Sequence, residues 1–257
     1  MKIIYVIFVA ALSVIAPAIF LFLFGTVPQI LGIVLSATFV SLLMASGSLA
    51  NIPVVYYFNR KHSLNLRYKF SPLSFQTLML LVVFSIIIWF ILPLFSHPGL
   101  FFDNLIHRRA TVFLPGLESF SVSFVVFSMG KILIAPIMEE LIFRGVIFKL
   151  LKENYSFWIS VIISSMLFAG VHFNFSDLSF LFVYGILFCW VYDKTKSLWA
   201  PIVLHVLINF YSQTTRIQEF SMSPLNSLFY VIMVLLSVIL VLHILRFMGK
   251  NKHSSSL

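Results

Sequence analysis

Residues 119–149 read SFSVSFVVFSMGKILIAPIMEELIFRGVIFK, an apolar run long enough to cross a membrane as one helix. Two adjacent carboxylates, Glu139 and Glu140, lie inside this run, and Arg144 follows one helical turn later. A carboxylate at bilayer depth costs about 2.5–3.5 kcal/mol on insertion scales, so it marks a candidate functional site. The stretch therefore predicts a transmembrane helix and also the place where the chemistry of the protein occurs.

The whole chain has the composition of a polytopic membrane protein. Of its 257 residues 61% are hydrophobic and only 10% are charged, whereas a soluble domain has roughly 25% charged residues. Open sheets are not viable in lipid, and the apolar runs are too long for barrel strands. We expect an all-α fold, a single membrane domain over residues 1–257 with about eight transmembrane helices. The candidate spans are about 3–24, 31–57, 74–95, 119–149, 156–173, 178–193, 198–212 and 225–247.

The distribution of basic residues predicts the topology. If the N-terminus is cytoplasmic and the spans alternate, most of the 17 lysines and arginines fall on inside segments, and only Arg108, Arg109 and Arg216 fall outside. This positive-inside pattern places both termini in the cytoplasm. The net charge of +9 is therefore explained by topology and by contact with anionic lipids, and nucleic acid is not an expected partner. We expect the first helix to be retained, because its apolar run continues past the cleavage-like sequence Ala16-Pro17-Ala18.

Polar side chains inside the spans are the candidate site residues. Glu140 and Arg144 are four residues apart and share a helix face, so we expect them to pair. Glu139 is rotated by roughly 100° and must face another partner or a cavity. Lys131 is expected to snorkel toward the membrane surface.

Two later spans add histidines. His172 follows Phe168 by one turn, and His205 precedes Asn209 by one turn. Glutamate and histidine can activate a water for attack on a carbonyl, and histidine and asparagine can donate hydrogen bonds to the oxyanion that forms. These are the parts for peptide hydrolysis without a covalent nucleophile. The set Glu139, His172 and His205 could equally ligate zinc with an open fourth position, although no His-Glu-x-x-His sequence occurs.

The depths of these residues in the membrane, counted along each helix, argue against a contact between Glu139 and His172. At 1.5 Å per residue, Glu139 lies about 16 Å from the inner membrane surface and Asn209 about 17 Å, but His172 lies about 24 Å from it. Straight vertical helices would therefore keep His172 away from Glu139.

The three motifs together resemble the CPBP (Abi) family, which comprises CAAX-processing proteases and bacterial relatives linked to bacteriocin processing and self-immunity. The resemblance covers about residues 130–212 and rests on Glu139-Glu140-x-x-x-Arg144, Phe168-x-x-x-His172 and His205-x-x-x-Asn209, in that order. It implies an intramembrane endopeptidase in which Glu139 and His172 activate water, and His205 and Asn209 form the oxyanion site. Glu140, Arg144 and Phe168 would support them. Family members are often described as metalloproteases, so zinc at Glu139, His172 and His205 stays open.

Several functions remain open at this point. The leading hypothesis is a peptidase of the bacterial cell membrane that cleaves a hydrophobic or membrane-associated peptide. The alternatives are a non-catalytic immunity or scaffold protein that binds a toxin or a peptide precursor, and a transporter. A CAAX protein, a pheromone precursor and a bacteriocin are all candidate substrates, and the sequence leaves the oligomeric state open.

Overall fold

The computed structural model describes residues 2–96, 109–115, 122–173 and 177–221, together with residues 232 and 239. The chain divides into two compact units, described separately here: Met1–Pro72 with Ser119–Asn209, and Leu73–Glu118 with Phe210–Leu257. The first unit contains every candidate site residue.

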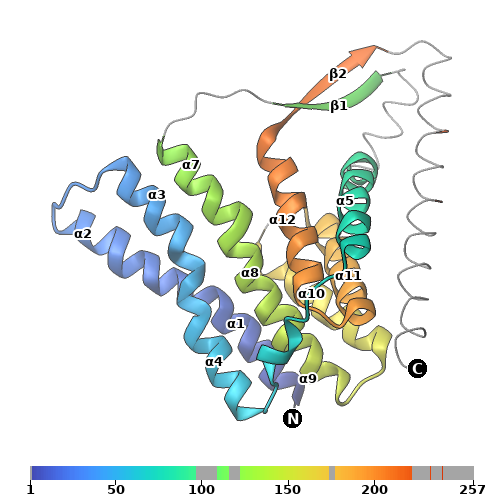
Figure 1. Cartoon of the computed structure of the whole chain (residues 1–257). Coiled ribbons are helices and arrows are strands. Elements are labelled where there is room, and N and C mark those ends of the chain that lie inside the picture. The colour runs from blue at the N-terminus through green and yellow to red at the C-terminus, as the bar shows by residue number, and fades with distance from the viewer. Residues whose placement is uncertain are drawn as a thin grey trace. The chain divides into compact units, whose positions relative to one another are not determined.

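The first unit begins with two long, interrupted helices (Figure 1). Their interruptions are π-helical or 3₁₀ turns rather than loops, so each helix continues in nearly the same direction. The first comprises α1 (Lys2–Leu21), a π turn (Phe22–Thr26) and α2 (Val27–Ile30). The second comprises α3 (Ala37–Ser46), a 3₁₀ turn (Gly47–Asn51) and α4 (Ile52–Lys61), and a further 3₁₀ turn spans Leu66–Lys69.

The third long helix carries the two adjacent glutamates. It comprises α7 (Val122–Met129), a π turn (Gly130–Ile134), α8 (Ala135–Glu140), a second π segment (Leu141–Ile147) and α9 (Phe148–Lys152). The unit is completed by α10 (Phe157–Gly170), α11 (Leu178–Thr195) and the greater part of α12 (Trp199–Thr214). In this unit α3 packs along α7, and α10 packs against α11.

Close packing of the third helix against α3 depends on a glycine. A β-carbon on Gly130 would lie 2.2 Å from the α-carbon of Ala45. No larger residue fits there, so the glycine brings the backbone of the third helix directly against α3.

The second unit contains α5 (Phe75–Ser96) and one pair of strands. Strand β1 (Arg109–Pro115) runs antiparallel to β2 (Thr215–Ser221), with Arg109 opposite Ser221 and Pro115 opposite Thr215. The sequence did not predict this pair, because it joins segments about a hundred residues apart and leaves no local hydropathy signal. The predicted eighth span, 225–247, lies almost entirely outside the described residues.

The pattern of burial is that of an integral multi-pass membrane protein. Four of the described helices are long and apolar enough to cross a membrane: Ile3–Ile30, Ala37–Lys61, Val122–Lys152 and Leu178–Thr195. Large apolar side chains such as Ile4 and Phe8 face outward, whereas Glu140 and Arg144 are fully buried. This distribution suits a lipid environment, where the interior holds the polar groups. The predicted helical bundle is thus confirmed, and the number of eight helices is approximate.

The basic residues gather at one end of the first unit, as the topology prediction requires. The Lys149 amine donates to the Leu64 carbonyl, and the amines of Lys152 and Lys196 both bind the Asp193 carboxylate. These contacts join the inner ends of the second and third long helices, and of the third helix and α11. This end is the expected cytoplasmic face.

Candidate active site

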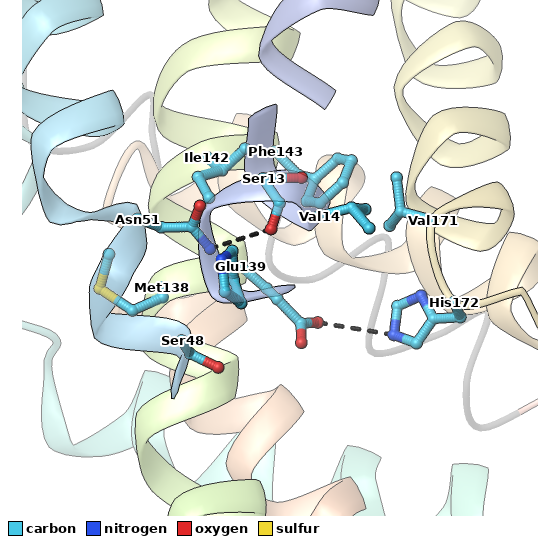
Figure 2. Close-up of a pocket in the computed structure, with 11 residues that line it drawn as sticks. Ser13, Val14, Ser48, Asn51, Met138, Glu139, Ile142, Phe143, Val171 and His172 are labelled. Atoms are coloured by element: carbon cyan, nitrogen blue, oxygen red, sulfur yellow. Dashed lines mark hydrogen bonds and ion pairs between the residues drawn. The ribbon is translucent and has the colours of Figure 1, made fainter. Parts of the chain in front are cut away.

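Glu139 lies between the two histidines predicted to act with it. Its Oε2 is 3.7 Å from Nε2 of His172 and 3.9 Å from Nε2 of His205. The carboxylate comes from α8, His172 from the turn after α10, and His205 from α12. Figure 2 shows the Glu139 carboxylate and the His172 ring pointing toward one another. Three helices thus bring together one residue from each of the three motifs.

The contact with His172 overturns the depth expectation. The third helix continues to Lys152 and α10 begins at Phe157, so both inner ends lie further along the chain than the hydropathy boundaries suggested. Counted from these ends, Glu139 lies about 20 Å along its helix and His172 about 22 Å along its own. The apparent gap came from the boundaries and not from the helices.

Glu140 forms the buried part of the site. Its Oε1 accepts from NH1 of Arg144 at 2.8 Å and from Nδ1 of His205 at 2.9 Å. NH2 of Arg144 donates to the carbonyl oxygen of Gly185 at 3.1 Å. The predicted Glu140–Arg144 pair is therefore confirmed, and it also orients His205.

Two aromatic rings enclose this network. The guanidinium carbon of Arg144 lies 4.7 Å from the centre of the Phe168 ring and 5.0 Å from that of Phe188. The Phe188 ring also stacks on His205 at 4.7 Å. Such cation–π contacts are strongest where water is excluded. Phe168, predicted as a supporting residue, therefore touches the buried cation, and Phe188 is a supporting residue that the motifs did not reveal.

Backbone and side-chain acceptors fix the tautomers of both histidines. Nδ1 of His172 lies 2.7 Å from the carbonyl oxygen of Phe168, and Nδ1 of His205 faces the Glu140 carboxylate. Since both partners accept, Nδ1 carries the proton in each neutral ring and Nε2 carries the lone pair. Oε2 of Glu139 is buried and has no hydrogen-bond partner in the structure. Oε2 of Glu139 and Nε2 of both histidines therefore face one another as three acceptors. A proton donor shared between them, or a cation, would stabilise this arrangement.

Asn209 contacts a different part of the third helix. Its Nδ2 donates to the carbonyl oxygen of Lys131 at 3.0 Å. In the π turn the N–H of Ala135 bonds to the Gly130 carbonyl, five residues back, and the next residue, Pro136, has no N–H. The Lys131 carbonyl thus lacks its donor within the helix, and Asn209 supplies one. Asn209 was predicted to donate to an oxyanion, and this contact shows a structural partner two helical turns from Glu139.

The side chain of Lys131 points away from the site, and its snorkelling stays a prediction. It is exposed, and its amine lies 4.7 Å from the centre of the Phe127 ring. Only the main chain of Lys131 takes part in the contact with Asn209.

A cavity of about 220 Å³ opens beside Glu139 and His172 (Figure 2). Sequence reasoning missed half of its wall, because the first part of the chain carries no motif. Its polar signal was weak: a serine and an asparagine within apolar spans. The missed residues are Ser13, Val14 and Pro17 of α1 and Ser48 and Asn51 of the 3₁₀ turn.

A carboxylate and two imidazoles are suitable ligands for zinc, but in this structure the three side chains lie too far apart to bind one ion. Zinc bonds of about 2.0–2.1 Å to nitrogen and oxygen imply ligand separations of roughly 3.4 Å in a tetrahedron, and here they are 3.7 and 3.9 Å. Among the described residues no group of three or more His, Cys, Asp or Glu side chains lies close enough to hold a metal. Glu139, His172 and His205 would hold zinc only after closing by a few tenths of an ångström.

The comparison with protein families agrees with the motifs. Residues 121–211 match the family model described as type II CAAX prenyl endopeptidase Rce1-like. The matched segment begins just before α7 and ends within α12, so it contains all three motifs. The expected resemblance to CAAX-processing proteases is confirmed over this segment.

Two bacterial proteins are similar to this chain over segments of 80 and 83 residues. "Putative membrane peptidase YdiL" of Bacillus subtilis (strain 168) is 40% identical over 80 residues, which cover 30% of this chain and 32% of that protein. "Membrane-embedded CAAX protease MroQ" of Staphylococcus aureus (strain USA300) is 37% identical over 83 residues, 30% of this chain and 34% of that protein. The chain matches about a third of the length of each relative.

Proposed function

We propose that this protein is an intramembrane endopeptidase that hydrolyses a peptide bond in a hydrophobic or membrane-associated peptide. The observation that carries the proposal is the buried, unpartnered Oε2 of Glu139, which lies within 4 Å of Nε2 of both His172 and His205. A direct hydrogen bond is excluded at these distances, but a water placed between the three atoms could reach all of them.

In this mechanism Glu139 and His172 take a proton from that water as it attacks the scissile carbonyl. The proton then passes to the departing amine, so the two residues act first as base and then as acid. His205 donates from Nε2 to the developing oxyanion when its ring is protonated, and Glu140 stabilises that imidazolium at Nδ1. Asn209 was predicted as a second oxyanion donor; one N–H of its amide donates to the Lys131 carbonyl, and its other N–H would have to serve the oxyanion.

Zinc offers a second way to activate the same water. It would be held by Glu139, His172 and His205, and it would act as a Lewis acid on the water or on the carbonyl. A chelator separates this mechanism from the metal-free one.

The test is cleavage of fluorogenic hydrophobic peptides by the purified protein in mild detergent. Glu139→Gln keeps the shape of the side chain but cannot take a proton, so we expect its rate to fall by about 10²–10⁴-fold. Glu153→Gln changes a glutamate outside the site and is the matched control. Unchanged cleavage by Glu139→Gln would exclude the mechanism, and loss of wild-type activity in chelator would assign the water to a metal.

A wild type that cleaves nothing would favour a non-catalytic binding protein instead. The names of the two relatives support a peptidase, and that of the S. aureus protein supports CAAX-type processing. Pheromone or bacteriocin processing and self-immunity in a bacterial cell membrane are roles compatible with such an activity.

A further inference from the structure

The cavity beside Glu139 has an apolar wall on one side of the reacting groups. Val14 and Pro17 come from α1, Met138 and Ile142 from the third helix, and Val171 from the end of α10. Glu139 and His172 form the polar side of the same cavity (Figure 2). An apolar group bound here would therefore sit directly beside the candidate nucleophilic water.

The size of the cavity limits what it accepts. A cavity of about 150 Å³ lined by apolar side chains binds benzene, so about 220 Å³ accommodates one leucine- or phenylalanine-sized side chain. Pockets for larger ligands start at about 300 Å³. The volume of the cavity is matched to one amino-acid side chain, and its open side leaves room for the rest of a bound peptide to continue outside it.

A buried amide adds a polar anchor to this apolar wall. Asn51 is only 5% exposed, and its Nδ2 donates to the Ser13 carbonyl at 3.1 Å, which orients the amide. Its Oδ1 is buried and has no hydrogen-bond partner in the structure. An unpaired buried acceptor costs free energy, and the N–H of an extended peptide backbone is a donor that would satisfy it.

We propose that this cavity is the substrate side-chain subsite, that it selects one medium-sized apolar residue beside the scissile bond, and that Asn51 positions the substrate backbone there. The inference rests on the proposed peptidase function. It assigns a specificity role to α1 and the 3₁₀ turn, which lie outside the matched segment.

The first experiment narrows the cavity. Val14→Phe places a larger side chain in the wall, and Ile15→Phe changes the neighbouring residue, which is 47% exposed on the outside of the helix. The probes are quenched-fluorescence peptides that differ at one position in Gly, Ala, Leu, Phe or Trp. We expect wild type and Ile15→Phe to favour Leu or Phe over Gly by about 10–100-fold in kcat/KM, and Val14→Phe to favour Ala. An unchanged preference in Val14→Phe would overturn the subsite.

The second experiment tests Asn51 from both sides of the contact. N-methylation of the peptide, scanned across the bonds next to the cleavage site, removes one backbone donor at a time. At one position we expect N-methylation to lower kcat/KM by about 10-fold for wild type. For Asn51→Leu, the methylated and unmethylated peptides should have the same kcat/KM. If the loss from N-methylation and the loss from Asn51→Leu were additive at every position, the positioning role would be overturned.

Binding keeps the inference distinct from the proposed function. The same labelled peptides are titrated into wild type, Glu139→Gln and Val14→Phe, and fluorescence anisotropy is recorded. Leu-over-Gly selectivity in the first two proteins and its loss in the third would support the subsite even if no peptide were cleaved. Absence of side-chain selectivity in wild type would reject the subsite, whether or not cleavage depends on Glu139.

Discussion

Arg144 shows how a fully buried charge can be tolerated in this fold. Its guanidinium meets one carboxylate, one main-chain carbonyl and the faces of two aromatic rings. Removing one partner of such a pair leaves the other charge buried without compensation. The residue thus compensates the Glu140 carboxylate that also holds His205.

Substitution of Arg144 by methionine is therefore expected to lower the free energy of unfolding by about 3–5 kcal/mol. Replacing both partners, as Arg144→Met with Glu140→Leu, should recover part of this loss because no unpaired charge remains. Equilibrium unfolding in detergent micelles measures both variants. A double variant that is less stable than Arg144→Met alone would contradict the argument.

At the scale of elements, the contact between the third long helix and α12 depends on the π turn Gly130–Ile134 and on Pro136. Pro136 has no N–H to donate to the Lys131 carbonyl five residues before it. Asn209 of α12 donates to this carbonyl instead. This contact joins two helices that carry motif residues.

The pairing predicts a rescue experiment. Asn209→Leu should cost about 1–3 kcal/mol of stability, because it leaves a carbonyl without a donor. Adding Pro136→Ala restores an N–H to the helix and should return most of that stability. If Asn209 also donates to the oxyanion, peptide cleavage will stay low in the double variant while the melting temperature recovers. A double variant no more stable than Asn209→Leu would show that the Lys131 carbonyl is not the reason for the loss.

Much of the helical framework could be predicted from the sequence, because hydropathy alone marks apolar spans. The Glu140–Arg144 pair was predictable too, since residues four apart on one helix always share a face. The family resemblance implied that Glu139 meets His172, but counting depth along the helices did not, because the depth depends on where helices end to within a turn. The contributions of Asn51 and Phe188 depend on tertiary packing, which no local pattern records.

At the scale of the whole molecule, the charge distribution predicts the orientation in the membrane. Lys196 follows α11 at the basic end of the first unit, and Val34, which is 95% exposed, lies in the turn after α2. The positive-inside pattern places the first in the cytoplasm and the second outside.

Cysteine accessibility measures this orientation directly. Cys189 is buried, so Cys189→Ala gives a cysteine-free background at small cost. In that background we expect a membrane-impermeant maleimide to label Val34→Cys in intact spheroplasts and Lys196→Cys only in inverted vesicles. The reverse labelling pattern would mean that the N-terminus lies outside.

Three motif side chains share one kind of anchor: Asn209, His172 and Arg144 each bind a main-chain carbonyl, those of Lys131, Phe168 and Gly185. Every residue type has a carbonyl, so the chemical identity of an anchoring residue is free to drift while the anchor persists. Only the space around it is constrained, as at Gly185, where a β-carbon would lie 2.7 Å from that of Ser165. Relatives of this protein can therefore keep the same frame of motif side chains while differing at anchoring residues, such as Lys131, that contribute only a main-chain carbonyl.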